Sequence, residues 1–204
     1  MRAKNVINYY VLCNKLKDKI RSGWIQWEVN RERLESVADH TFGTLNLAIA
    51  IYSEYEYDIG LNKVLFMLAI HEIEEIIIGD ITIRDSNYHM KEELGHKAIK
   101  EILKDLKMKY DLENLILEFD EKKTKEALFA HYCDKLECDI QAKLYDEENC
   151  IDINKYDLEK SELKNHSDEK SWSNMWIEFD RRLYKDDNFI EIIDYLKNNE
   201  IKSE

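Results

Sequence analysis

Two short stretches of the sequence each place a histidine close to a carboxylate. Residues 36–40 read SVADH and end in His40, while His71 and Glu72 are adjacent and Glu75 follows one helical turn later. A further acid, Asp134, lies in the second half of the chain. Imidazole and carboxylate ligands together suit Mn, Co, Ni, Fe or Zn better than Ca or Mg, which prefer oxygen-only sites. The residue types therefore predict a mixed nitrogen and oxygen site for one divalent transition metal.

The combination of these residues carries the prediction, because a single inward histidine is more often a satisfied core residue than a ligand. His71 and Glu72 follow the apolar run VLFMLAI, and an unpaired carboxylate on a buried helix would cost free energy. A shared cation would compensate that cost. The segment is not a zincin motif, because His-Glu-x-x-His needs a second histidine where this chain has Glu75.

The elements that must position these residues are predicted to be helices. The chain has 204 residues, no proline and five glycines, so few residues interrupt long helices. We predict one all-α core with helices over 5–20, 88–108, 112–119 and 124–146, and a loop over 21–35. This length suits a single domain with a full core.

The helices that carry the histidines have recognisable ends. Ser36 with Asp39 three residues later is the capping-box arrangement, so a helix should begin at residue 37 and turn His40 inward. A second helix should begin after Gly60 and run to Gly79, a typical left-handed cap. Its continuous apolar run predicts that it is buried on every side.

Composition excludes several functions. The formal net charge of −13 argues against a broad basic surface for a nucleic acid polymer, although one local cation could hold a single phosphate. The sequence shows neither an apolar run long enough to span a membrane nor a secretory signal at its N-terminus, and no two cysteines form a C-x-x-C pair. We therefore expect a cytoplasmic protein with reduced thiols.

Several motifs in order resemble the HD-domain metal-dependent phosphohydrolases, in particular their 5′-deoxyribonucleotidase group. The motifs are RSGW at residues 21–24, ESVADH at 35–40, HExxExxxGDIT at 71–82 and DKLE at 134–137. The resemblance covers about residues 10–147. It implies an HD-type helical domain over 1–147. The remainder, over 148–204, is more acidic and has an apolar stripe at helical spacing, so we expect an acidic C-terminal helical extension packed on the same domain.

The resemblance also assigns roles. It implies that His40, His71, Glu72 and Asp134 hold one metal, which would lower the pKa of its bound water towards ~7 and neutralise charge on the phosphoryl oxygens. Glu75 would handle a proton or orient water, and Asp80 would contact the substrate or the reacting water. Arg21 would bind the phosphate through its planar guanidinium, and Trp24 would line the nucleoside pocket or serve as a core residue. His131 and His96 are weaker candidates for further roles near the metal.

Glu72 departs from the family pattern, in which the second pair is His-Asp. Glutamate is longer by one C–C bond, about 1.5 Å, so it either adjusts its rotamer, reaches a differently placed metal, or marks a site that binds metal poorly.

The resemblance implies a 5′-nucleotidase acting on small nucleoside monophosphates, of the deoxy forms or others. The alternatives are a hydrolase of another phosphorylated metabolite and a non-catalytic regulatory module. A homodimer is left open, since the apolar stripe from Trp172 to Leu183 suits either a core or an oligomer contact.

Overall fold

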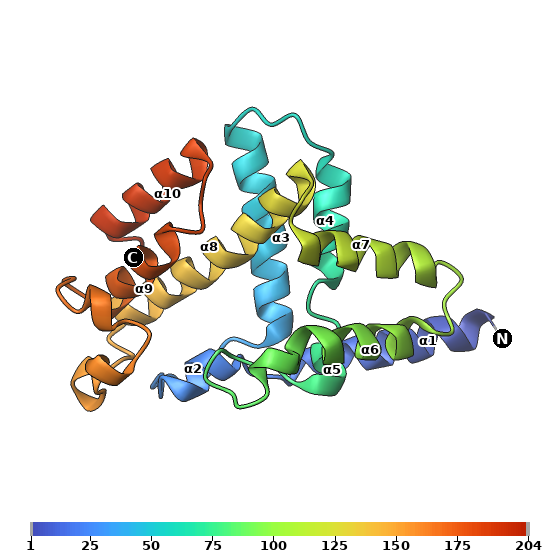
Figure 1. Ribbon diagram of the computed structural model, residues 1–204, viewed down its shortest axis with the longest axis horizontal. Helices are drawn as coiled ribbons and strands as arrows, with labels where there is room; N and C mark the ends of the chain where they lie inside the picture. Colours follow the sequence, from blue (N-terminus) through green and yellow to red (C-terminus); the bar gives the residue numbers. More distant parts are fainter. Residues whose placement is uncertain (1, 203–204) are drawn as a thin grey trace. The chain divides into compact units, whose positions relative to one another are not determined.

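A computed structural model describes residues 2–202, and within that range the protein is all-α, as the sequence predicts. No β-strand forms there, and one isolated antiparallel bridge joins Ile20 to Ser36. The helices in chain order are α1 (Arg2–Cys13), α2 (Ser22–Gln26), α3 (Val37–Glu54), α4 (Leu61–Ile70), α5 (Glu75–Ile78), α6 (Lys91–Leu103), α7 (Lys109–Glu121), α8 (Lys125–Glu147), α9 (Trp172–Arg181) and α10 (Asp187–Asn198) (Figure 1).

The chain divides into two compact units. The first contains residues 2–26 and 33–131, and the second contains residues 27–32 and 132–202. The sequence prediction instead separated a family domain, ending at residue 147, from a C-terminal extension. The two compact units do not test that boundary, and it stays a prediction. No helix in the described range is long and apolar enough to cross a membrane.

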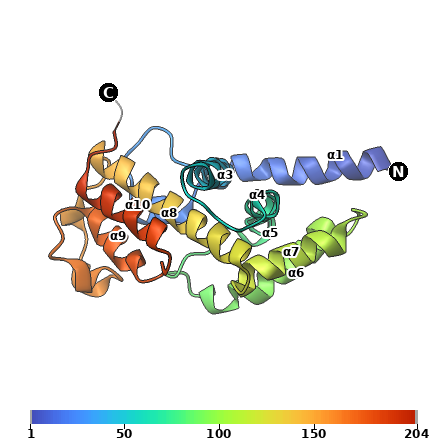
Figure 2. The same cartoon turned by 90° about the horizontal axis from the view of Figure 1, so that it is seen from above.

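The first unit has a core of aliphatic side chains. α3 packs against α4, and α6 packs against both α5 and α7; seen from above in Figure 2, α7 overlaps α6. The buried side chains at its centre are Leu16, Val37, Ile70, Ile73, Ile76, Ile99, Ile102, Leu103 and Ile116. This core fixes the backbone on which the two histidines lie.

The start of α3 follows the predicted capping box. The Ser36 hydroxyl accepts the Asp39 N–H, and the Asp39 carboxylate accepts the Ser36 N–H. Val37, His40 and Thr44 are all buried, which confirms the predicted inward face. The cap thus fixes where α3 begins, and the buried face of this helix carries His40 into the interior.

The predicted helix from Gly60 to Gly79 is wrong in two respects. It is interrupted at residues 71–74. The His71 Nδ1 atom lies 2.8 Å from the Leu68 carbonyl oxygen, which would otherwise accept the Glu72 N–H of a continuous α-helix. The backbone tightens to i, i+3 hydrogen bonds, such as Glu75 N–H to the Glu72 carbonyl, before α5 resumes. The helix is also not buried on every side, since Phe66 is 51% exposed.

Other boundaries differ from the sequence prediction where distant contacts decide them. Residues 22–26 form α2 within the predicted loop, because the Asp80 carboxylate accepts the Ser22 N–H at 2.6 Å and caps the turn. The first helix ends at Cys13 and continues as a 3₁₀ turn over Asn14–Lys17. α6 is shorter than predicted and α7 is longer, whereas α8 agrees within a residue at each end.

The second unit is built around aromatic side chains. The ring of Trp27 packs against those of Tyr156, Trp172 and Trp176, at centroid distances of 4.7, 5.6 and 5.9 Å. Trp172 and Met175 are buried, so this part of the apolar stripe of α9 belongs to the core of the unit. The Asn30 N–H donates to the Cys150 carbonyl and ties residues 27–32 to the same core. The cysteines form no disulfide in the described range.

Candidate active site

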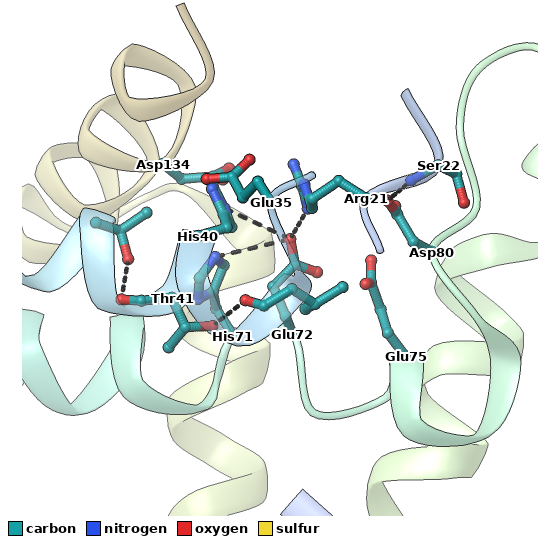
Figure 3. Close-up of polar contacts among 12 residues, drawn as sticks. Arg21, Ser22, Glu35, His40, Thr41, His71, Glu72, Glu75, Asp80 and Asp134 are labelled. Atoms are coloured by element: carbon teal, nitrogen blue, oxygen red, sulfur yellow. Dashed lines mark hydrogen bonds and ion pairs between the residues drawn. The ribbon is translucent and has the colours of Figure 1, made fainter. Parts of the chain in front are cut away.

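The first unit brings His40, His71 and Glu72 together. Their donor atoms all lie within 4.8 Å of one another, and the three side chains are buried. The Nε2 atoms of His40 and His71 each lie 3.8 Å from Glu72 Oε1 (Figure 3). His40 comes from the buried face of α3, and the other two come from the tightened turn after α4.

This donor set fits a divalent transition metal. Two donors about 2.1 Å from one ion lie roughly 3 to 3.5 Å apart, so distances of 3.8 Å need a closure of only a few tenths of an ångström. The Leu68 carbonyl oxygen can only accept a hydrogen bond, so a neutral His71 ring carries its proton on Nδ1. The lone pair of Nε2 is then available on the side of the ring that faces Glu72. The predicted mixed nitrogen and oxygen chemistry therefore has a structural basis in these residues.

Asp134 lies in the second unit, on α8. It is 6% exposed, and the Lys135 ammonium lies 3.3 Å from its Oδ2 atom. A buried carboxylate next to one lysine is consistent with a ligand and also with an ion pair. Its predicted role as a fourth ligand therefore stays a prediction.

Arg21 lies next to the three donors. Its guanidinium donates to Glu72 Oε1 at 3.0 Å, and its side chain is 14% exposed. The backbone holds it there, because the Arg21 N–H donates to the Glu35 carbonyl and the Val37 N–H donates to the Lys19 carbonyl. A guanidinium in this position can reach an anion bound beside the metal ligands.

Two further predicted residues lie on the opposite side of Glu72 from the histidines. The Glu75 carboxylate is fully buried, and its Oε2 atom accepts no hydrogen bond from the described residues. Figure 3 shows the Glu72 and Glu75 side chains reaching toward the same space. Asp80 uses one carboxylate oxygen to cap α2 through Ser22, which leaves the other for a different partner.

The electrostatics of this region are dominated by carboxylates. Burial, and then the neighbouring Glu72 and Asp80 carboxylates, raise the pKa of Glu75 far above the usual carboxyl range. Burial and the Glu72 carboxylate raise the pKa of Glu74 to about 8. Burial is the first cause of both shifts, and the contribution of the neighbouring carboxylates is the part that a bound cation would offset.

Trp24 is 8% exposed, and its indole N–H donates to Glu35 Oε2 at 2.7 Å. Glu35 has no role among the sequence predictions, although it opens the ESVADH motif. Neither have Glu74, which lies within the HEIE turn itself, and Lys91 on α6, whose ammonium lies 3.5 Å from Glu75 Oε1. No local pattern marks Lys91, because it reaches the site through the packing of α6.

The two weaker histidine candidates have other neighbours. His96 Nε2 lies 2.9 Å from Asp120 Oδ2, in a pair whose side chains are about one third exposed. The ring of His131 packs edge-on against Phe119, with centroids 6.2 Å apart. Neither contact involves the three donors described above.

A buried cluster of two histidines and a carboxylate on an all-α scaffold, next to an arginine and further acids, is typical of metal-dependent hydrolases. A protein-family model described as HD domain matches residues 13–176 of this sequence, so the chain belongs to the HD-domain family. The match extends beyond residue 147, where the resemblance based on motifs alone ended. The protein is a metal-dependent phosphohydrolase of this family, as the sequence predicts.

Curated relatives carry a more specific name. The chain is 30% identical over 152 residues to a 5′-deoxynucleotidase HDDC2 of Dictyostelium discoideum, covering 71% of this chain and 79% of that protein. It is 27% identical over 149 residues to the human 5′-deoxynucleotidase HDDC2, covering 71% and 70%.

Solved structures share the fold. A conserved hypothetical protein from Pyrococcus furiosus matches with a TM-score of 0.70 and 26% identity, over 95% of this chain and 99% of that one. A structure from Magnetospirillum magnetotacticum, described as a predicted metal-dependent phosphohydrolase, matches with a TM-score of 0.59 and 24% identity. It covers 70% of this chain and 71% of the other.

Proposed function

We propose that the protein is a phosphomonoesterase acting on nucleoside 5′-monophosphates, with the deoxy forms as the preferred substrates. The observation that carries the proposal is the buried group of His40, His71 and Glu72, with the Arg21 guanidinium 3.0 Å from the same carboxylate. The 5′-deoxynucleotidase relatives support the choice of substrate class.

We assign the metal to His40, His71 and Glu72, with Asp134 as the fourth ligand. A divalent ion held there supplies charge neutralisation at the phosphoryl oxygens and lowers the pKa of water. The same donors suit Mn, Co, Ni, Fe or Zn.

The other residues act on the substrate. The Arg21 guanidinium binds phosphate oxygens, where its planar fork can donate two hydrogen bonds. Glu75, buried and reaching into the same space as Glu72, holds or passes the proton that the leaving nucleoside oxygen needs.

Asp80 keeps Arg21 in place through the Ser22 N–H and contacts the substrate or water with its other oxygen. Trp24, anchored by Glu35, forms a wall for the nucleoside.

The proposal is tested by a phosphate-release screen with each metal supplied separately. The panel contains ribo- and deoxynucleoside 5′-monophosphates, 3′-monophosphates and sugar phosphates. We expect the wild-type protein to release phosphate from nucleoside 5′-monophosphates. We expect His71→Ala to lose both this activity and the bound metal. Turnover confined to sugar phosphates would reject the nucleotide substrate, and full metal content in His71→Ala would reject the metal site.

A further inference from the structure

Lys91, the first residue of α6, extends its ammonium toward the acidic side of the site. Its Nζ atom lies 3.5 Å from Glu75 Oε1, and its side chain is 31% exposed. Burial alone would lower the pKa of Lys91, but the carboxylates of Glu72, Glu75, Asp80 and Glu74 outweigh it and raise the pKa. The side chain is therefore a charged group that faces both solvent and the buried acids.

Packing of α6 fixes this position. Gly95 lies one helical turn after Lys91, and a Cβ atom built on it would come within 3.3 Å of Glu74 Cγ. The glycine thus lets the first turns of α6 approach the Glu74–Glu75 segment closely. Lys91 reaches Glu75 because the helix backbone is held there, which makes its location a property of the fold.

A phosphate monoester needs such a cation in this region. The ester carries about 1.5 to 2 negative charges at neutral pH, and it would lie beside the carboxylates of Glu72 and Asp80 and the carboxyl group of Glu75. The guanidinium of Arg21 is shared with Glu72. A lysine has three N–H donors, and the 3.5 Å separation from Glu75 is long for a hydrogen bond, so donors remain for phosphoryl oxygens.

We propose that Lys91 is a second phosphate-binding cation of the active site, acting beside Arg21. This inference rests on the proposed phosphomonoesterase function, since it names the residue that receives the substrate's phosphate on the Glu75 side. Glu75 then has two roles, because it holds the lysine in place and lies next to the phosphoryl group.

The test compares Lys91→Met and Lys91→Arg with the control Lys97→Met. Lys97 lies on the same helix and pairs with Glu93 on the exposed surface, so the control removes an equal charge away from the site. Inorganic phosphate is titrated into each metal-loaded protein by calorimetry, and KM and kcat are measured with the best nucleoside monophosphate.

We expect Lys91→Met to raise the dissociation constant of phosphate and the KM by about ten- to a hundredfold, as for loss of a hydrogen bond to a charged group. Lys91→Arg should recover part of the affinity, Lys97→Met should stay within twofold of wild type, and metal content should not change. If Lys91→Met does not fold, Lys91→Gln takes its place.

Phosphate affinity in folded Lys91→Met within twofold of wild type would overturn the inference. So would a loss equally large in Lys97→Met, which would reflect net charge alone. A wild-type protein that hydrolyses no monophosphate would defeat the proposed function instead, and the phosphate titration would then decide the role of Lys91 by itself.

Discussion

Glu72 is the residue at which this chain departs from the pattern of its family. Its Oε1 atom lies 3.8 Å from both imidazole Nε2 atoms and 3.0 Å from the Arg21 guanidinium. The longer side chain therefore reaches the space between the two histidines, where a shared ion would sit. The residue also lies on the tightened turn after α4, so its backbone differs from that of a regular helix. The first of the sequence alternatives, a ligand that adjusts its rotamer, stays a prediction and is the one tested below.

Shortening this side chain should weaken the metal site. In Glu72→Asp the carboxylate recedes by about 1.5 Å from the imidazoles, so we expect metal affinity to fall about tenfold or more, with a lower kcat. Metal titration followed by calorimetry measures the change. Glu74→Asp is the matched control, because it shortens a neighbouring buried carboxyl that is not among the donors. Tighter metal binding in Glu72→Asp would show that the glutamate is a poor ligand that the family aspartate improves.

At the scale of elements, local sequence signals predicted the helices well where the determinants are local. Ser36 and Asp39 lie within one turn, and the cap they predict is present. The interruption at residues 71–74 could not be predicted from propensity, since HEIE contains neither proline nor glycine. It depends on the contact of the His71 ring with the Leu68 carbonyl, and α2 depends on a carboxylate 58 residues away. Both exceptions adjoin the site, where side chains compete with the backbone for hydrogen bonds.

α8 carries a further buried acid, Asp139, which interacts with the half-buried Asp180 on α9. Asp139 is 2% exposed, and it accepts a hydrogen bond from the Tyr184 hydroxyl at 3.1 Å. Burial, and then the Asp180 carboxylate, raise the pKa of Asp139 well above its usual value, against the hydrogen bond from Tyr184 and the charge of Lys135. The folded protein therefore binds this proton more tightly than the unfolded chain does.

The sign of the pH dependence follows. The protonated Asp139 carboxyl stabilises the folded protein fully below the pKa of the same group in the unfolded chain, which is about 3.9. This stabilisation is lost as the pH rises through the higher pKa of Asp139 in the folded protein. We expect the free energy of unfolding of wild type, relative to Asp139→Asn, to fall by up to about 1.4 kcal/mol per pH unit above pH 4. Urea unfolding of both proteins from pH 4 to 8 measures this difference. A difference independent of pH would show that Asp139 is ionised in the folded protein.

At the scale of the whole molecule, the sequence predicted the fold class, and it predicted less well which segments pack together. Composition was sufficient for an all-α fold, and the motifs located the three donors that lie within 4.8 Å. The grouping of residues 27–32 with the C-terminal unit depends on Trp27 meeting Tyr156 and Trp172, which no local pattern encodes. The position of Lys91 likewise depends on the approach of α6 to Glu74 through Gly95.

Metal binding should stabilise the entire folded chain, because His40 and His71 come from separate helical segments that converge only on folding. A ligand at a hundred times its dissociation constant adds about 2.7 kcal/mol to the free energy of unfolding. For a protein of this size, that corresponds to a rise in Tm of about 5 to 11 °C. We therefore expect added Mn²⁺ or Co²⁺ to raise the Tm of wild type by this amount.

The variants decide whether the stabilisation comes from the proposed site. His71→Ala should show little or no rise in Tm with metal, since it removes a donor of the buried group. His96→Ala should keep the wild-type rise, because His96 pairs with Asp120 and lies outside that group. With 43 acidic residues and a net charge of −13, the chain also attracts cations nonspecifically, and that contribution is screened by salt and shared by every variant. An equal rise in wild type and His71→Ala at 0.15 M salt would therefore place the bound metal on the acidic surface and remove His71 from the site.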